Sequence, residues 1–583
     1  MSHKAPQFIQ KIRNISWYFV GLLVIACIFR IALLGNVPTG VSNDELDYIL
    51  NAKSVFLQQS DISNTWNPLS LTTPQSSFPQ AEIAPLLMAP FIGLFPLSLF
   101  LSKLSYALIS IGTIIIIYLI AKRLFDQKIA FIAGLAASIN PWLIFFGRTA
   151  YDTPLAIFFY LCALYVLLIT KKWHILLAFP LFFLGFYSYI GTKLILIPFA
   201  AISVYYSWRF INNKKYAKQY LIVIALCIAI IFSYAIQTLT AGKNRVSEIS
   251  SPYMPSIATT VDYQRKQSLD TPLNGFFSNK FTVFVDYSIE KYINTFSPNF
   301  LFLSGDAKPQ FSLWEHGVFY IIDAIFIIIG LYFLFKRNQK EALLFCALIL
   351  LAPLPSLISN VGTSYAIRSM LMAPLLLIVV GIGIKSLLDT TKPHLLKTLT
   401  IWCILIFYFF QLFNFLNIYI LRNPIYNSES FNFSSRELVK YLTLSHQNKI
   451  IYVVNGDPKT PLKHYLFYTN SLDKTMLNKI EHMYKDKKYQ IDNIQFITCD
   501  QIPRNLENNL LIYESSSKCR NVPKGNSLSI AQLSDSGSIH NIVNDTVCTN
   551  YNLQRYISGL KYTDMNIENL SERQFCEKFI VRR

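Results

Sequence analysis

Long apolar stretches recur along the first 420 residues of this 583-residue chain and constrain its fold more than any other feature. A helix needs about 20 mainly apolar residues to cross roughly 30 Å of hydrocarbon, where no water satisfies the backbone amides. By that length rule we place about eleven spans. They lie near 17–35, 101–121, 129–147, 153–170, 175–190, 194–209, 219–239, 317–335, 341–358, 369–388 and 398–420.

The composition supports a membrane protein, since 53% of the residues are hydrophobic and only 15% are charged, against roughly a quarter charged in soluble domains. The segment 83–97 is also apolar, but Pro85, Pro90 and Pro96 interrupt it. Proline removes a helix hydrogen bond, so we expect this segment to be re-entrant or interfacial. The predicted fold class is a polytopic α-helical membrane protein of about eleven spans, followed by a soluble tail.

Lysine and arginine are unevenly distributed between the connectors, which predicts the orientation of the spans. Alternate connectors are basic and are expected on the cytoplasmic side. Their cations are Lys4, Lys11, Arg13, Lys122, Arg123, Lys128, Lys171, Lys172, Arg209, Lys214, Lys215, Lys218, Lys336, Arg337, Lys340, Lys385, Lys392 and Lys397. The amino terminus is then inside and, after an odd number of spans, the carboxyl end outside. This topology accounts largely for the net charge of +19, so no nucleic-acid partner is expected.

Residues 1–420 therefore form the predicted transmembrane domain, with the outer loops 36–100 and 240–316, and residues 421–583 form an extracytoplasmic domain. A connection as long as the second loop is uncommon in a compact domain unless it has a function.

The composition of the tail is that of a soluble domain. Strand-like runs at 450–454 and 510–513 alternate with helix-like segments at 433–443 and 472–485. This alternation predicts a small α/β domain.

Four cysteines lie in the tail, and an even number outside the cytoplasm predicts disulfides. Three pairings are possible, of which we expect Cys499 with Cys519 and Cys548 with Cys576. No pair has the CxxC spacing of a zinc site, and no metal is expected.

Two adjacent carboxylates, Asp44 and Glu45, directly follow the first span. Apolar residues at helical spacing after them predict an amphipathic helix on the outer membrane surface. Ser42 and Glu45 have the spacing of a capping box, which is a purely structural role. Alternatively, a carboxylate held at this surface is a general base for an acceptor hydroxyl, and both roles are compatible.

Isolated cations occur in the outer connectors, against the topological trend. They are Arg148, Lys193 and Arg368. A lipid-headgroup contact, snorkelling to the interface or, for Arg148, a salt bridge to Asp152 would explain them. The functional alternative is binding of a phosphate, which suits the guanidinium fork.

Polar and aromatic residues in or beside the outer connectors are candidates for binding a sugar or an acceptor. They are Tyr48, Tyr151, Asp152, Tyr189 and Asp306. The sequence contains no Walker loop, dinucleotide fingerprint or HExxH motif. Nucleotide-driven chemistry is therefore not expected.

The first span followed by Pro38-Thr39-Gly40 and Asp44-Glu45 resembles the opening of the GT-C membrane glycosyltransferases, in particular the bacterial protein O-mannosyltransferase and aminoarabinose-transferase-like family. Asn140-Pro141 before Arg148 and Asp152, the segment 297–306, and Pro353-Leu354-Pro355 before Arg368 extend the resemblance over about residues 15–390.

The resemblance implies an inverting glycosyltransferase that takes a sugar from a polyprenyl-phosphate carrier in the bacterial inner membrane and passes it to an acceptor glycan, lipid or protein on the outer face. It implies that Asp44 is the base, with Glu45 as second candidate, and that Arg148, Lys193 and Arg368 stabilise the leaving phosphate. No cofactor or metal is implied beyond the lipid-linked donor and the surrounding membrane lipids.

An oligosaccharide ligase or oligosaccharyltransferase also uses such donors, but the latter is expected to carry a WWD-type motif, and no tryptophan follows Trp402. A non-enzymatic transporter should place several charges within its spans and show inverted repeats. Only Arg30 and Asp323 are expected well inside spans, which favours the enzyme.

Overall fold

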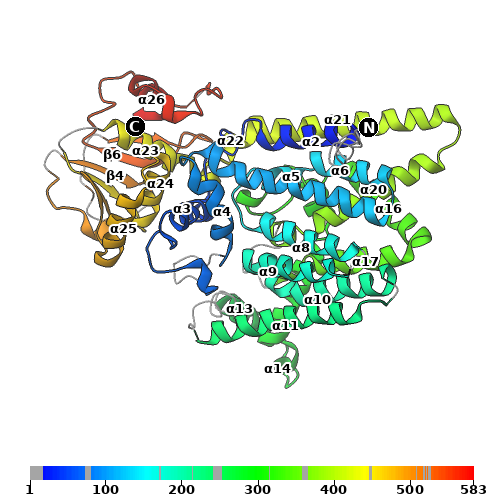
Figure 1. Ribbon diagram of the computed structural model, residues 1–583. Coiled ribbons are helices and arrows are strands. Elements are labelled where there is room, and N and C mark those ends of the chain that lie inside the picture. The colour runs from blue at the N-terminus through cyan, green and yellow to red at the C-terminus, as the bar shows by residue number, and fades with distance from the viewer. Residues whose placement is uncertain are drawn as a thin grey trace, which may run out of the picture.

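The computed structural model consists of a helical bundle and a sheet domain joined end to end (Figure 1). It describes residues 17–582 except for 73–80, 170–171, 213, 241–252, 314, 358–365, 446–448, 507–508, 517–518, 520–521, 523–526 and 558. The predicted cytoplasmic cations Lys4, Lys11, Arg13 and Lys171 lie outside the described residues.

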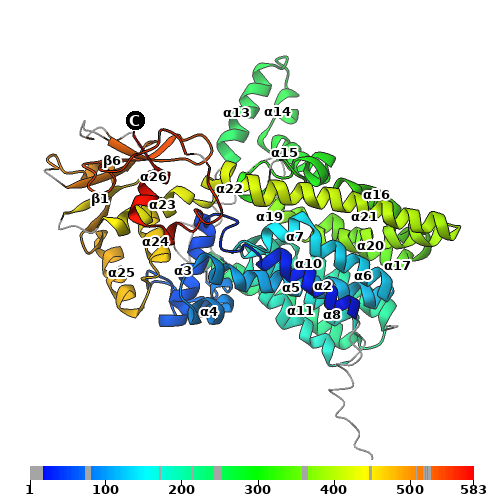
Figure 2. The same ribbon diagram turned by 90° about the horizontal axis from the view of Figure 1, so that it is seen from above.

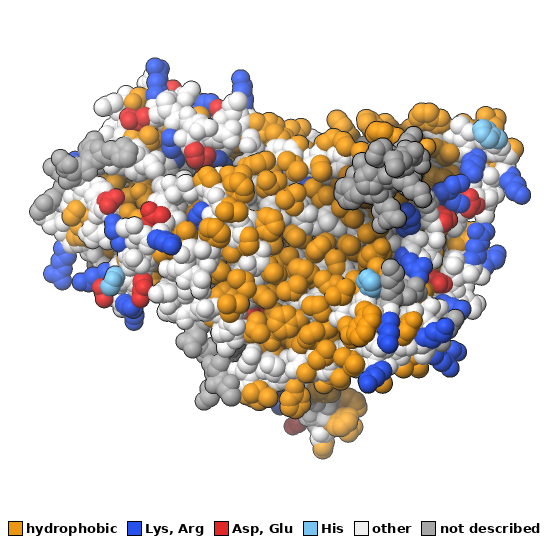
Figure 3. Space-filling view, viewed as in Figure 1, with side chains coloured by type: hydrophobic (Ala, Val, Ile, Leu, Met, Phe, Trp, Pro, Cys, Tyr) orange, Lys and Arg blue, Asp and Glu red, His pale blue; other side chains and the backbone are white. Residues whose placement is uncertain are grey.

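A helix lies in each of the predicted apolar stretches. The helices of the bundle are α2 (Trp17–Ile31), α5 (Leu99–Leu124), α6 (Gln127–Ile139), α7 (Pro141–Phe146), α8 (Thr153–Leu168), α9 (Ala178–Ser188), α10 (Ile190–Tyr206), α11 (Ala217–Thr240), α16 (Ile321–Arg337), α17 (Gln339–Leu351), α18 (Leu354–Leu357), α20 (Met372–Thr390) and α21 (His394–Leu416). Over the described residues, six helical segments are long and apolar enough to cross a membrane. Figure 3 shows hydrophobic side chains over a broad area of the bundle, between two ends rich in charged side chains.

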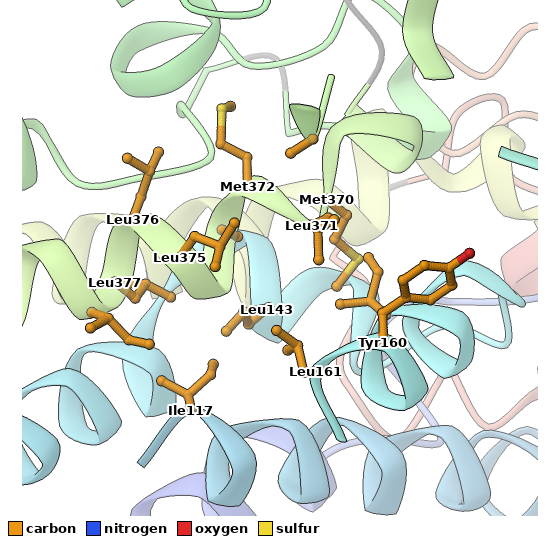
Figure 4. Close-up of a cluster of buried hydrophobic side chains, with 14 of the residues drawn as sticks. Ile117, Leu143, Tyr160, Leu161, Met370, Leu371, Met372, Leu375, Leu376 and Leu377 are labelled. Atoms are coloured by element: carbon orange, nitrogen blue, oxygen red, sulfur yellow. The ribbon is translucent and has the colours of Figure 1, made fainter. Parts of the chain in front are cut away.

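The centre of the bundle is closely packed. In Figure 4, side chains from α5, α7, α8 and the start of α20 meet, among them Ile117, Leu143, Leu161 and Leu375. Helices α16 and α20 approach closely at Gly383, where a Cβ atom would lie 2.1 Å from the carbonyl oxygen of Phe326. Small residues permit such backbone contact between membrane helices.

Both charged residues expected within spans are buried and hydrogen bonded. Arg30 donates to the carbonyl oxygen of Ala137 at 3.0 Å and to Ser110 Oγ at 3.3 Å. Asp323 accepts from the backbone N–H of Tyr320 at 3.0 Å. Each of these charged side chains is therefore hydrogen bonded within the protein.

The first outer loop forms α3 (Asn43–Gln58) and α4 (Ala84–Leu94), which pack against each other. The prediction that the apolar face of α3 lies on the membrane is wrong. Leu46, Ile49 and Leu50 are buried in a core shared with α4 and the carboxyl-terminal domain. Helix α4 forms in the interrupted segment despite Pro90 in its interior.

The second outer loop forms a helical hairpin that projects sideways from the molecule (Figure 2). It comprises α13 (Tyr253–Lys266), α14 (Asn274–Phe277) and α15 (Lys280–Asn294). After it, η4 (Asn299–Leu303) and η5 (Pro309–Phe311) return the chain to the bundle, and the short helix α19 (Ala366–Ser369) precedes α20.

The carboxyl-terminal domain is a mixed sheet of seven strands in the order β2-β3-β1-β4-β6-β5-β7. The strands are β1 (Ile451–Val454), β2 (Tyr489–Ile491), β3 (Ile494–Ile497), β4 (Leu510–Glu514), β5 (Ser527–Ala531), β6 (Ser538–Val543) and β7 (Ile580–Arg582). β1 pairs in parallel with β3 and β4, and the other pairs are antiparallel. The predicted strands are confirmed as β1 and β4.

The helices of this domain are α22 (Asn423–Tyr426), α23 (Phe433–Leu444), α24 (Lys459–Tyr468), α25 (Lys474–Asp486) and α26 (Glu572–Phe579). Of these, α23 and α25 lie in the predicted helix-like segments at 433–443 and 472–485, and the other three were not predicted. Disulfides join Cys499 to Cys519 and Cys548 to Cys576, which confirms the expected pairing.

Candidate active site

The connector between α2 and α3 is held by side chains that donate to five successive backbone carbonyls, from residue 37 to residue 41. We call this segment the carbonyl strip. Its donors are Arg148 to Val37 at 3.0 Å, Lys103 to Pro38 at 3.3 Å and to Gly40 at 2.6 Å, Arg436 to Thr39 at 2.7 Å, and Asn432 to Val41 at 2.9 Å. Buried carbonyl groups need such partners, and here cations supply most of them.

Two parts of the molecule contribute these donors. Lys103 and Arg148 come from the bundle, whereas Asn432 and Arg436 come from the carboxyl-terminal domain. Glycine is required within the strip, because a Cβ atom on Gly40 would lie 2.1 Å from the carbonyl oxygen of Phe431. The strip therefore fixes the position at which α3 begins.

Glu45 has a structural position. One of its oxygens accepts from the backbone N–H of Ser42 at 2.9 Å, and Ser42 Oγ accepts from the backbone N–H of Glu45 at 3.4 Å, so the predicted capping box is present. The other oxygen accepts from the backbone N–H of Ala150 at 2.7 Å. Both oxygens of this fully buried carboxylate are thus engaged by backbone, which leaves Asp44 as the base candidate.

Asp44 lies in the first turn of α3 and is exposed to solvent. Among the described residues, no group donates a hydrogen bond to the carboxylate of Asp44. Crowding by protein raises the pKa of its carboxyl, as do the charges of Asp47 and Glu45, while the nearby Lys308 ammonium opposes the rise. An accessible carboxylate with a raised pKa suits a group that must take up a proton.

Asp152 and Tyr48 lie beside Asp44. The Tyr48 hydroxyl, from α3, donates to Asp152 Oδ2 at 2.6 Å, and Asp152 directly precedes α8. Burial raises the pKa of Asp152 to about 7, and the charge of Asp44 adds to the rise. The predicted salt bridge between Arg148 and Asp152 is therefore replaced by a hydrogen bond from Tyr48.

Arg148 is buried and faces the end of the first helix. In addition to Val37, its guanidinium donates to the carbonyl oxygens of Phe29 at 3.0 Å and Ala32 at 2.7 Å. Its role in these contacts is structural, whereas the sequence suggested a phosphate ligand. A guanidinium donates hydrogen bonds to carbonyl oxygens and to phosphate oxygens alike, so the sequence alone does not show which of the two Arg148 binds.

Lys193 pairs with a carboxylate. Its ammonium lies 2.6 Å from Glu82 Oε1, with both side chains largely buried, and 3.8 Å from the centre of the Tyr234 ring. This arrangement differs from the predicted phosphate site, because Glu82 already neutralises the charge. Tyr189 is buried at the start of α10, and Tyr151 packs against the rings of Phe146 and Phe311.

Arg368 lies on α19 close to a second cation, Lys291 of α15. Lys291 is 8% exposed, and burial together with the charge of Arg368 lowers its pKa to about 8. Two neighbouring cations in a partly buried position repel each other, and an anion between them would relieve the repulsion.

Asp306 lies between the segment that carries Lys308, near Asp44, and the helix that carries Arg368. It is buried and accepts from the backbone N–H of Lys308 at 2.9 Å and of Ala366 at 2.5 Å, and burial raises its pKa to about 6. Lys308, two residues after Asp306, lies near Asp44, and Ala366 begins α19, the helix that carries Arg368. Asp306 thus holds the segments of Lys308 and Ala366 together through backbone hydrogen bonds.

Sequence reasoning missed Lys103, Lys291 and Lys308. Lys103 carries a signal that could have found it, because it is a lone charge near the start of an apolar stretch. Lys291 and Lys308 carry none that distinguishes them from ordinary loop lysines.

Residues 82–236 match the family model described as dolichyl-phosphate-mannose-protein mannosyltransferase. This match covers less than half of the chain. The matched segment includes Arg148, Asp152 and Lys193, and Asp44 precedes it. A comparison with curated proteins found no match.

Solved structures with similar chains include ArnT from Cupriavidus metallidurans bound to undecaprenyl phosphate, at 11% identity and a TM-score of 0.49, covering 91% of this chain and 98% of that one. Another is the Archaeoglobus fulgidus oligosaccharyltransferase in the apo form, at 12% identity and a TM-score of 0.46, covering 86% of this chain and 70% of that one.

Replacing Arg148 by Met should lower the stability of the protein by about 3 kcal/mol or more, because buried carbonyls lose their donors. Thermal unfolding in detergent measures this. Arg148→Lys, which keeps one cationic donor, should recover part of the loss. Unchanged stability with loss of polyprenyl-phosphate binding would instead restore the phosphate-ligand role.

Asp152 should make the protein less stable as pH rises. Between the ordinary value of 3.8 and the folded value of about 7, the folded state holds a proton that the unfolded chain releases, so stability falls through this window. Asp152→Asn should remove the fall and be more stable at about pH 8 by roughly 2 kcal/mol or more.

Unfolding midpoints of both proteins across that pH range provide the test. Asp286→Asn, at an exposed position on α15, is the control and should follow the wild-type curve. Parallel curves for Asp152→Asn and wild type would contradict the assignment.

Proposed function

We propose that this protein is an inverting glycosyltransferase that moves a sugar from a polyprenyl-phosphate carrier to an acceptor on the outer face of a bacterial inner membrane. The observation that carries the proposal is the family match, since that family is named for a dolichyl-phosphate-linked donor. The site supports it with an accessible carboxylate, Asp44, near Lys308, and with the neighbouring cations Arg368 and Lys291.

Asp44 is the proposed general base. Its carboxylate takes the proton of the acceptor hydroxyl as the acceptor oxygen attacks the anomeric carbon of the sugar. The bond between that carbon and the phosphate oxygen breaks, and the polyprenyl phosphate leaves with the electron pair. Because attack and departure occur on opposite faces of the carbon, the configuration inverts.

The leaving phosphate gains charge as the bond breaks, and cations aimed at it lower the barrier. Arg368 and Lys291 are the proposed phosphate ligands, since their mutual repulsion is relieved by an anion. Tyr48 and Asp152, which lie beside Asp44, are proposed to contact the sugar or the acceptor. The apolar bundle would accommodate the isoprenoid tail, and no nucleotide or metal has a role in these steps.

Asp44→Asn should reduce transfer by about 10²–10⁴-fold, the usual contribution of a general base, while donor binding is retained. The assay follows labelled sugar from a panel of polyprenyl-phosphate hexoses and pentoses into the protein, lipid and glycan fractions of a membrane extract. For wild type, kcat/KM should rise with pH to a plateau, because the base must be deprotonated.

Asp486→Asn is the matched control, because Asp486 is an exposed carboxylate at the end of α25. It should change transfer by less than about threefold. Full activity of Asp44→Asn would exclude Asp44 as the base, and a wild type that binds no polyprenyl phosphate would exclude the donor.

Arg368→Gln and Lys291→Gln should each weaken binding of a polyprenyl-phosphate sugar by roughly 10- to 100-fold, the value of a hydrogen bond to a charged group. Binding of the corresponding polyprenol, which lacks the phosphate, should not change. Lys280→Gln, at an exposed position on the same helix as Lys291, serves as control. Equal losses with the alcohol would show that these cations act on the fold and not on the phosphate.

A further inference from the structure

A cavity opens at the end of the bundle that lies away from the carbonyl strip. It has a volume of about 550 Å³ and lies between α2, α5, α6, α20 and the start of α21. Along α5, Tyr118 at this cavity is 15 residues beyond Lys103, which contacts the carbonyl strip, a rise of roughly 22 Å. The cavity is therefore separate from the proposed active site.

The apolar part of this cavity has aromatic walls. Phe19 and Tyr118 pack with their ring centres 4.8 Å apart, and Tyr18 and Phe131 with theirs 5.7 Å apart. Ile132 and Leu388 complete this surface. Rings and aliphatic side chains in this arrangement suit an acyl chain, and aromatic residues gather where a bilayer meets water.

The rim of the cavity is basic. It carries Lys128, Lys385 and Lys397, with Asp389 as the acidic residue among its lining. Lys385 forms an ion pair with Asp389, so the lysines exceed the carboxylate by two positive charges. The amide groups at the start of α6 are taken up by the Asp126 side chain, which leaves the ammonium groups to attract an anion.

This end of the bundle is the one that the distribution of cations predicts to be cytoplasmic. A basic rim above an apolar cavity between membrane helices matches the two halves of an anionic lipid, namely a phosphate headgroup and acyl chains. A zwitterionic lipid offers the same chains but a compensated headgroup.

We propose that this cavity binds one anionic phospholipid of the inner leaflet, with its phosphate on Lys128 and Lys397 and an acyl chain along the aromatic walls. The ligand chemistry is a phosphate group, which a lipid or a free phosphate could supply, and the apolar volume favours the lipid. The site does not depend on the activity proposed for Asp44.

Native mass spectrometry of the detergent-purified full chain tests the proposal with added phosphatidylglycerol and with phosphatidylcholine of the same chains. Wild type should retain one phosphatidylglycerol about tenfold more tightly. Lys128→Gln with Lys397→Gln should abolish that preference, and the same pair changed to Arg should keep it. Ile132→Trp, which fills the apolar floor and keeps every lysine, should also lose the lipid.

The matched control is Lys336→Gln with Lys340→Gln, which removes two exposed cations from the same end of the bundle outside the cavity and should bind like wild type. Equal retention of both lipids, or an equal loss in the control, would overturn the proposal. Displacement of the lipid by inorganic phosphate, with binding insensitive to Ile132→Trp, would assign the site to free phosphate and overturn the lipid assignment.

Discussion

The arrangement of the candidate active site depends on satisfying five consecutive carbonyl groups away from water. A chain that leaves a membrane helix and turns at once into a second helix exposes carbonyl oxygens that no regular structure pairs. Here Arg148, Lys103, Arg436 and Asn432 supply the donors. With the strip fixed, the capping box of Ser42 and Glu45 sets the direction of α3, and Asp44 stands in its first turn.

The charged side chains around the carbonyl strip include those bound to backbone groups and those open to solvent. Glu45 and Asp306 are buried and accept from backbone N–H groups, and Arg148 donates to carbonyls. Asp44 differs, because it is exposed and its pKa is raised by its surroundings. Like charges also lie near one another at Asp44 and Asp152 and at Lys291 and Arg368, and shifted pKa values of this kind are typical of functional sites.

Local patterns predicted much of this molecule. Apolar stretches located the helices, Ser42 and Glu45 stood at capping-box spacing, and sequence-neighbouring cysteines paired. The predictions that were wrong concern residues whose partners are distant in the sequence. The apolar face of α3 has the same pattern whether lipid or protein covers it, and α24 and α25, which pack against it, follow some 400 residues later. Likewise, the cations Arg148 and Lys193 were recognisable as unusual, but their partners Val37 and Glu82 lie 111 residues away in each case.

The donors from the carboxyl-terminal domain have a consequence for biosynthesis. The carbonyl groups of Thr39 and Val41 accept hydrogen bonds from Arg436 and Asn432, which lie 397 and 391 residues further along the chain. Arg436 in turn forms an ion pair with Glu568, near the end of the chain. Chains are made from the amino terminus and fold domain by domain. Helix α3 is therefore synthesised early, but it acquires its final position only after the carboxyl-terminal domain has been made. A chain that stops short of Glu568 lacks the ion pair that holds Arg436, so completion of synthesis becomes a condition for the geometry of the candidate site.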